Sequence, residues 1–117
     1  MKLYNFKIEE FACPCCGANK MQNSTMIALD LARDILKEPI ILNSAYRCER
    51  HNKEVSGSIT SSHLTGYAAD IQVKSSGYRY EILTALRNVG FNRFGIYSTF
   101  VHVDSDPNKT KNVTWCK

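Results

Sequence analysis

Apolar and polar side chains alternate along residues 100–104, and this pattern limits how the segment can fold. Alternation with a period of two is typical of a β-strand that has one face in a core. Val101 and Val103 would then face the core, whereas His102 and Asp104 would share the opposite face. The pattern therefore predicts a strand that carries potential ligand side chains on the side away from the core.

The remaining segments indicate an α+β domain with a small antiparallel sheet flanked by helices. Residues 68–73 predict a strand in which Asp70 points away from the core. The last two strands would pair as an antiparallel hairpin. The other expected elements are a strand at 40–42, a short helix at 48–55, a loop at 57–62, a helix that ends at Gly90 and a strand at 94–97.

A longer helix is predicted at residues 25–37, with Ser24 as its N-cap. Ile27, Leu31 and Ile35 repeat at four-residue spacing and form one apolar stripe on this helix. We expect the stripe to pack in the core.

Length and charge narrow the class of protein. A chain of 117 residues supports one core, so we expect a single domain over 1–117, in which 1–23 form an irregular, cysteine-containing lead. No apolar run reaches the roughly 18 residues of a membrane span, and the first residues lack the apolar stretch of a signal peptide. We therefore expect synthesis in the cytoplasm and no membrane partner. The net charge of +4 comes from scattered basic residues, which disfavours nucleic acid as a partner.

Three side chains could form a catalytic zinc site. His63, Asp70 and His102 supply two imidazoles and a carboxylate, the ligand set of a site that keeps one position open for water. Spacing alone leaves plainer roles open, because a single histidine on a strand is more often a surface or core residue. Non-haem iron uses the same ligand set, but its usual barrel scaffold is larger than 117 residues supply.

Taken together, these residues and their neighbours resemble the zinc D-alanyl-D-alanine carboxypeptidase family. The resemblance covers roughly residues 40–104 and rests on Ser-Ala-Tyr-Arg at 44–47, on Asn52, on SxHxxGxAxD at 61–70 and on FVHVD at 100–104. The family includes bacterial cell-wall peptidases and phage endolysins, and it shares its fold with the hedgehog signalling domain. The resemblance thus implies a hedgehog/DD-peptidase fold.

The resemblance also implies roles for individual residues. His63, Asp70 and His102 correspond to the three zinc ligands. Arg47 corresponds to an arginine that holds a carboxylate of the peptidoglycan stem peptide, as a guanidinium can do with two parallel hydrogen bonds. Ser61 would hydrogen-bond to a ligand residue or to substrate.

The general base departs from the family pattern. Many members carry an acid three residues before the last histidine ligand, where this chain has Thr99. Asp104 shares a strand face with His102 and could either deprotonate the attacking water or support the imidazole from behind. Glu54 is a further candidate for the base.

The cysteines suggest a second metal. Five cysteines are an odd number in a chain without a signal peptide, which favours metal or thiol roles over a disulfide framework. Cys13 and Cys16 form a Cys-x-x-Cys pair typical of half a zinc knuckle and are candidates for a structural metal. A closed site needs two further ligands, for which Cys15, Cys48 and Cys116 are available. Free thiols are the alternative.

The function implied by the resemblance is that of a zinc-dependent metallopeptidase acting on bacterial peptidoglycan stem peptides. It would work as a D-Ala-D-Ala carboxypeptidase or as an endolysin-type endopeptidase. We expect a monomer encoded by a phage or prophage, which reaches the cell wall after release or on a virion. The alternative is a non-catalytic zinc-binding interaction domain of the same fold, which the absence of an acid at Thr99 favours.

Overall fold

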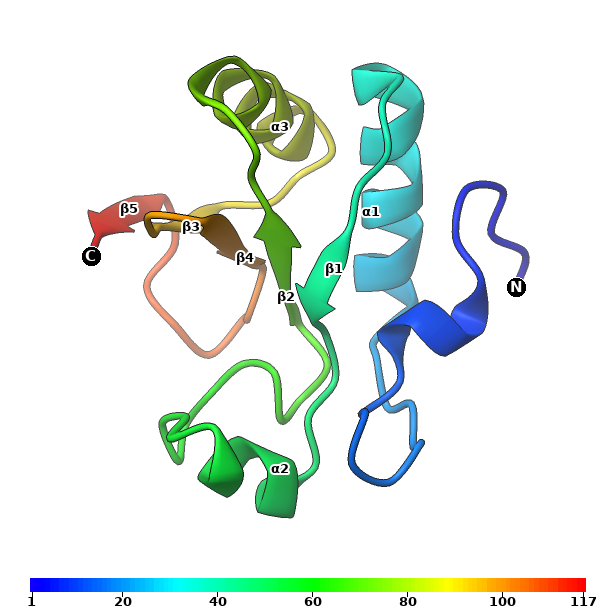
Figure 1. Cartoon of the computed structure of the whole chain (residues 1–117), viewed down its shortest axis with the longest axis vertical. Coiled ribbons are helices and arrows are strands. Elements are labelled where there is room, and N and C mark those ends of the chain that lie inside the picture. The colour runs from blue at the N-terminus through cyan, green and yellow to red at the C-terminus, as the bar shows by residue number, and fades with distance from the viewer.

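The computed structural model describes all residues from 1 to 117 (Figure 1). It contains a short 3-10 helix, three α-helices and five β-strands. In chain order these are η1 (Ile8–Phe11), α1 (Asn23–Leu36), β1 (Leu42–Ser44), α2 (Glu49–Glu54), β2 (Ala68–Gln72), α3 (Ser76–Asn88), β3 (Arg93–Ile96), β4 (Phe100–Asp104) and β5 (Val113–Cys116). None of the helices combines the length and the apolar character needed to cross a bilayer.

The strands form one sheet in the order β1-β2-β4-β3-β5. The first four pair in antiparallel fashion, which confirms the predicted α+β class and the hairpin of β3 and β4. The fifth strand was not predicted, and it lies parallel to β3. Residues 105–112 return the chain from the end of β4 to the start of β3, so β5 runs in the same direction as β3. With four residues, β5 is too short for its alternation of half-buried and exposed side chains to identify a strand from the sequence alone.

The two faces of the sheet have different roles. Val101 and Val103 are fully buried and belong to one apolar cluster with Ile71 of β2, as the period of two predicts. Helices α1 and α3 lie side by side and contribute Leu29 and Leu86 to the same cluster (Figure 1). The helices therefore cover the apolar face, and the opposite face is left for polar side chains.

The predicted burial of α1 is wrong. Ile27, Leu31 and Ile35 are exposed, with 43%, 51% and 49% of their surface accessible, whereas Leu29 is fully buried. The helix carries a second apolar stripe that includes Leu29, and packing has selected that one. The helix also begins at Asn23 with Gln22 as its N-cap, so the N-cap prediction is wrong as well.

The N-terminal lead packs against one side of α1. The carboxylate of Asp30, itself buried, accepts hydrogen bonds from the backbone N–H groups of Tyr4 and Asn5. Phe6 and Phe11 then enter the apolar cluster. The lead thus covers the side of α1 that carries Asp30, next to the face that packs in the core.

Candidate metal centre

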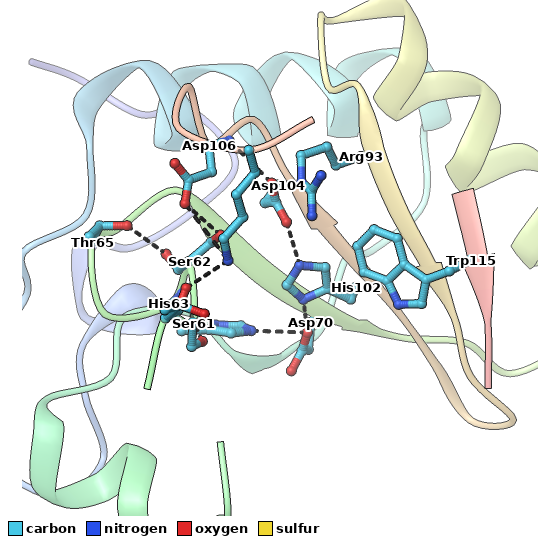
Figure 2. Close-up of polar contacts among 12 residues, drawn as sticks. Ser61, Ser62, His63, Thr65, Asp70, Arg93, His102, Asp104, Asp106 and Trp115 are labelled. Atoms are coloured by element: carbon cyan, nitrogen blue, oxygen red, sulfur yellow. Dashed lines mark hydrogen bonds and ion pairs between the residues drawn. The ribbon is translucent and has the colours of Figure 1, made fainter. Parts of the chain in front are cut away.

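Three predicted ligand residues converge on the polar face of the sheet. His63 comes from the loop before β2, Asp70 from the middle of β2 and His102 from the middle of β4. Asp70 and His102 lie directly opposite one another across the β2–β4 pair. One ligand atom from each of the three residues lies within 4.8 Å of the others. Figure 2 shows the two imidazoles directed at the Asp70 carboxylate.

The contacts of the two imidazoles indicate which nitrogen atoms would face a metal ion. A neutral imidazole carries a proton on one nitrogen and a lone pair on the other. His63 Nδ1 donates to the carbonyl oxygen of Ala45 at 2.7 Å, and His102 Nε2 donates to Asp104 Oδ2 at 2.7 Å. With the protons on these two nitrogens, the lone pairs lie on His63 Nε2 and His102 Nδ1, the atoms that face Asp70.

These two lone pairs face an atom that can only accept. Asp70 Oδ1 lies 3.2 Å from His63 Nε2 and 3.0 Å from His102 Nδ1. A cation among the three atoms would satisfy all of them, so this donor set fits a divalent metal ion such as zinc. Without a metal ion, an extra proton on an imidazole satisfies the Asp70 oxygen instead. Burial disfavours the imidazolium, but the hydrogen bonds to Asp104 and Asp70 outweigh burial and raise the pKa of His102.

Asp70 is held on both sides. Burial alone would raise the pKa of its carboxyl group, but the adjacent imidazoles of His102 and His63 keep that pKa well below its usual range. Its second oxygen, Oδ2, accepts from Arg47 Nη2 at 3.1 Å. The carboxylate is therefore ionised and oriented, with one oxygen turned toward the imidazoles.

Arg47 is itself held in place by two further contacts. Its Nε donates to Ser44 Oγ at 2.9 Å, and its Nη1 donates to Asn52 Oδ1 at 3.2 Å. This arrangement accounts for Ser44, Arg47 and Asn52 together, three of the positions on which the family resemblance rests.

Behind His102 lies a buried polar layer. Asp104 is 1% exposed, and its Oδ1 accepts from Arg93 Nε at 2.8 Å and from the backbone N–H of Asp106 at 3.1 Å. Asp106 in turn accepts from the hydroxyl of Ser62 at 2.8 Å. Burial opposes the charge on Asp104, but the hydrogen bonds from His102 and Asp106 and the charge of Arg93 lower its pKa. Asp104 is thus an ionised acceptor for His102 (Figure 2).

The loop that carries His63 is held by local contacts. Ser61 Oγ accepts from the backbone N–H of His63 at 3.2 Å, so its hydroxyl orients the loop. Gly66 has a φ of 80°, and a side chain there would come within 2.3 Å of the carbonyl oxygen of Lys20. Only glycine therefore permits this turn between His63 and Asp70.

A cleft of about 210 Å³ lies on the Asp70 side of the centre. Arg47, Asp70 and Phe100 line it, together with His51 from α2. Glu54, a predicted candidate for the base, is exposed on α2, with its Oε1 3.9 Å from His51 Nδ1. Thr99 is exposed beside the turn between β3 and β4.

Several residues of the centre were not predicted. The ring of Trp115 lies 5.6 Å from that of His102, and Arg93 lies over the Trp115 ring at 5.3 Å. Both reach the site through the pairing of β3 with its neighbours, which no local sequence pattern reveals. His51 and Asp106 were also missed, because loop and short-helix positions carry no periodic signal.

The predicted cysteines do not belong to this centre. Cys13 and Cys16 lie in the N-terminal lead, and the sulfur of Cys13 lies near those of Cys15 and Cys48. These cysteines form a group apart from His63, Asp70 and His102.

A sequence profile of the peptidase M15 family matches residues 4–104, which is most of the chain. No curated protein sequence matches it. Members of this family are zinc-dependent peptidases, and the converging histidines and aspartate offer a place for such a metal. The chain therefore belongs to the peptidase M15 family, as the residue patterns at 61–70 and 100–104 imply.

Proposed function

We propose that this protein is a zinc-dependent hydrolase of peptide bonds in bacterial peptidoglycan stem peptides. The observation that carries the proposal is the placement of two imidazole lone pairs and a carboxylate oxygen around one point, beside a cleft lined by Arg47. His63 Nε2, Asp70 Oδ1 and His102 Nδ1 would hold the metal. When bound, zinc polarises the scissile carbonyl and makes a water molecule more acidic.

Arg47 would bind a carboxylate of the stem peptide. A guanidinium has five N–H groups, and the contacts with Ser44, Asn52 and Asp70 leave some of them free to face the cleft. Because Arg47 is tied to Asp70, a substrate held by it would have a fixed position relative to the ligands. This supports a role in setting which bond is cut.

Asp104 would act as a positioning residue. It accepts from the His102 nitrogen that faces away from Asp70, and its other oxygen is engaged by Arg93. These contacts support the second of its two predicted roles, in which it keeps the proton on His102 Nε2. Ser61, which accepts from the backbone of His63, would likewise support a ligand rather than bind substrate.

The attacking water must give up a proton, and we infer that His51 receives it. His51 lines the cleft with Asp70 and Arg47, and imidazole can accept and donate protons near neutral pH. Glu54, 3.9 Å from His51 Nδ1, would stabilise the imidazolium that forms. This arrangement would replace the acid that Thr99 lacks.

The finer features of the proposal come from the resemblance. We infer a phage or prophage endolysin-type enzyme that acts as a monomer, with residues 1–117 folding as one domain. The single apolar cluster that joins Phe6 of the lead to Val103 of the sheet supports one folding unit. The cleaved bond would be D-Ala-D-Ala or another bond of the stem peptide or cross-bridge.

The alternative is a zinc-binding interaction domain without catalysis. The observation that favours it is the full engagement of Asp104 together with the lack of an acid at Thr99. One experiment separates the two. Zinc-loaded protein, chelated protein and a His63→Ala variant are incubated with purified peptidoglycan, and the released fragments are identified by mass spectrometry. Zinc-dependent fragments with a new peptide terminus support the enzyme, and intact peptidoglycan in all three samples supports the interaction domain.

A further inference from the structure

Three of the five cysteines gather at one place although they come from two distant segments, and a fourth is next to them in the sequence. Cys13, Cys15 and Cys16 lie in the N-terminal lead, and Cys48 follows β1. The sulfur atoms of Cys13, Cys15 and Cys48 lie within 4.8 Å of one another. The Sγ atoms of Cys13 and Cys48 are 3.7 Å apart, and all four thiols are free.

Cys16 supplies a fourth thiol. It directly follows Cys15 in the lead and is exposed, so it is available to the three sulfur atoms that lie together. The crowding of four groups that become anionic is the arrangement that a bound cation relieves.

The spacing of the sulfur atoms matches that of a metal–thiolate centre. Zinc bound by four cysteines has Zn–S distances of about 2.3 Å, which places neighbouring sulfurs about 3.8 Å apart in a tetrahedron. The observed 3.7 Å between Cys13 and Cys48 agrees with this separation. Four thiolates fill every position of a tetrahedral ion, unlike the three ligands of the histidine centre.

The backbone around the cluster is arranged to support thiolates. The N–H of His51 donates to the sulfur of Cys48 at 3.4 Å. Gly17, at a φ of 76°, turns the lead back so that the N–H of Cys13 donates to the carbonyl oxygen of Ala18 at 2.8 Å. Such N–H···S bonds stabilise sulfur ligands in their charged form.

We propose that Cys13, Cys15, Cys16 and Cys48 bind one thiolate-preferring divalent metal ion, zinc, in a closed structural site. The predicted Cys13–Cys16 pair is thereby extended by Cys15 and Cys48. The ion fastens the N-terminal lead to the segment after β1, where the N–H of Tyr46 already donates to the carbonyl oxygen of Phe11 at 3.2 Å.

A metal ion at the cysteines would also affect the histidine centre. The segment that the ion would hold contains Ala45, whose carbonyl oxygen orients His63, and Arg47, which holds Asp70. Loss of the ion should therefore loosen the residues that orient two of the three histidine-centre ligands, without removing any of them.

The test uses the full chain, purified under reducing conditions and reconstituted with cobalt or zinc. The cobalt form of the wild type should show the intense near-ultraviolet thiolate-to-cobalt charge-transfer absorption. The zinc form should contain about two zinc ions per chain by elemental analysis. A His63→Ala/His102→Ala variant should keep about one ion and the full charge-transfer absorption.

The cysteine variants provide the matched comparison. Cys13→Ser/Cys48→Ser should lose the absorption and about one zinc ion per chain, whereas Cys116→Ser, an exposed thiol on β5, should change neither. Should the double variant fail to fold, titration of the wild-type thiols with a mercurial reagent should release the cysteine-bound zinc instead. Wild-type cobalt protein without charge-transfer absorption would overturn the proposal. The proposal would also be overturned if the intact protein had a mass two hydrogens below that of the fully reduced chain, because this difference reveals a covalent Cys13–Cys48 bond.

Discussion

Asp104 accepts a hydrogen bond from His102 Nε2 at 2.7 Å, on the side of the imidazole turned away from Asp70. The two residues come from the same strand face and differ by two positions, so the strand itself sets their contact. Their pairing leaves His102 Nδ1 free for a metal and occupies the carboxylate that could otherwise have served as a base.

Asp104→Asn should therefore weaken metal binding more than it slows the chemical step. Loss of a carboxylate behind a histidine ligand typically costs about 10–100-fold in metal affinity. Peptidoglycan hydrolysis should recover in excess zinc, with Glu81→Gln on the exposed surface of α3 as the control. A fall of about 10²–10⁴-fold in kcat with zinc fully bound would assign Asp104 the base role instead.

Arg47→Ala should raise KM for a stem peptide with a free terminal carboxylate by about tenfold or more, because an arginine–carboxylate pair is lost. The same peptide with an amidated terminus should be affected less, because it loses only the orientation that Arg47 gives to Asp70. Arg47→Lys should restore the activity only in part, since an ammonium cannot form two parallel bonds. Steady-state kinetics with zinc content measured on each sample checks this prediction, which equal effects on both peptides would contradict.

His51→Gln should lower kcat by about 10²-fold or more while zinc content stays unchanged, because the proposed proton acceptor is lost without any ligand being touched. Glu54→Gln should have a smaller effect in the same direction, since its carboxylate lies 3.9 Å from His51. Single-turnover hydrolysis of a stem peptide measures both variants. Full activity in His51→Gln would exclude it as the base.

Zinc affinity at the histidine centre should weaken as pH falls. Because the pKa of His102 is raised in the metal-free protein, zinc must displace a proton from it. Below that pKa, each displaced proton costs about tenfold in affinity per pH unit. Calorimetric titrations of Cys13→Ser/Cys48→Ser, in buffers that differ in ionisation enthalpy, count the released protons. No proton release between about pH 5 and about pH 7 would contradict the prediction.

The stability of chelated protein should follow a different pH profile. The lowered pKa of Asp104 stabilises the fold above the ordinary carboxyl pKa, and this contribution is lost as pH falls through the lowered value. The raised pKa of His102 stabilises the fold below the ordinary imidazole pKa, and this contribution is lost as pH rises through the raised value. The pair therefore contributes most between about pH 4 and about pH 6.5. Urea unfolding in the presence of chelator, measured across this pH range, checks the prediction. In His102→Gln, the maximum in the free energy of unfolding between these pH values should disappear.

Substitutions on the two apolar stripes of α1 should differ in their effect on the free energy of unfolding. Leu29→Ala, at a fully buried position, should lower the free energy of unfolding by about 2–5 kcal/mol. Leu31→Ala, at a position with 51% of its surface accessible, should change it by about 0.5 kcal/mol or less. Chemical denaturation of the two variants provides the comparison. Equal losses would mean that both stripes are covered in solution.

Local patterns were enough to predict several parts of the molecule. Alternation along 100–104 predicted which side chains of β4 face the core, because successive side chains of any strand point to opposite faces. The residue string at 61–70 likewise indicated the family and identified His63 and Asp70 as a pair. Chemical type and short-range spacing are properties of the chain itself, so they could be read without a fold.

Other relationships depend on the tertiary structure alone. The apolar pattern of α1 contains two stripes, and packing against α3 and the core of the sheet buries Leu29 and leaves Leu31 exposed. The opposition of Asp70 and His102 depends on the register between β2 and β4, whose strands are separated by a whole helix. The approach of Cys48 to Cys13 joins segments 35 residues apart. Periodicity specifies which face a side chain takes, but the packing of distant segments determines which faces meet, because that choice minimises exposed apolar surface over the whole chain.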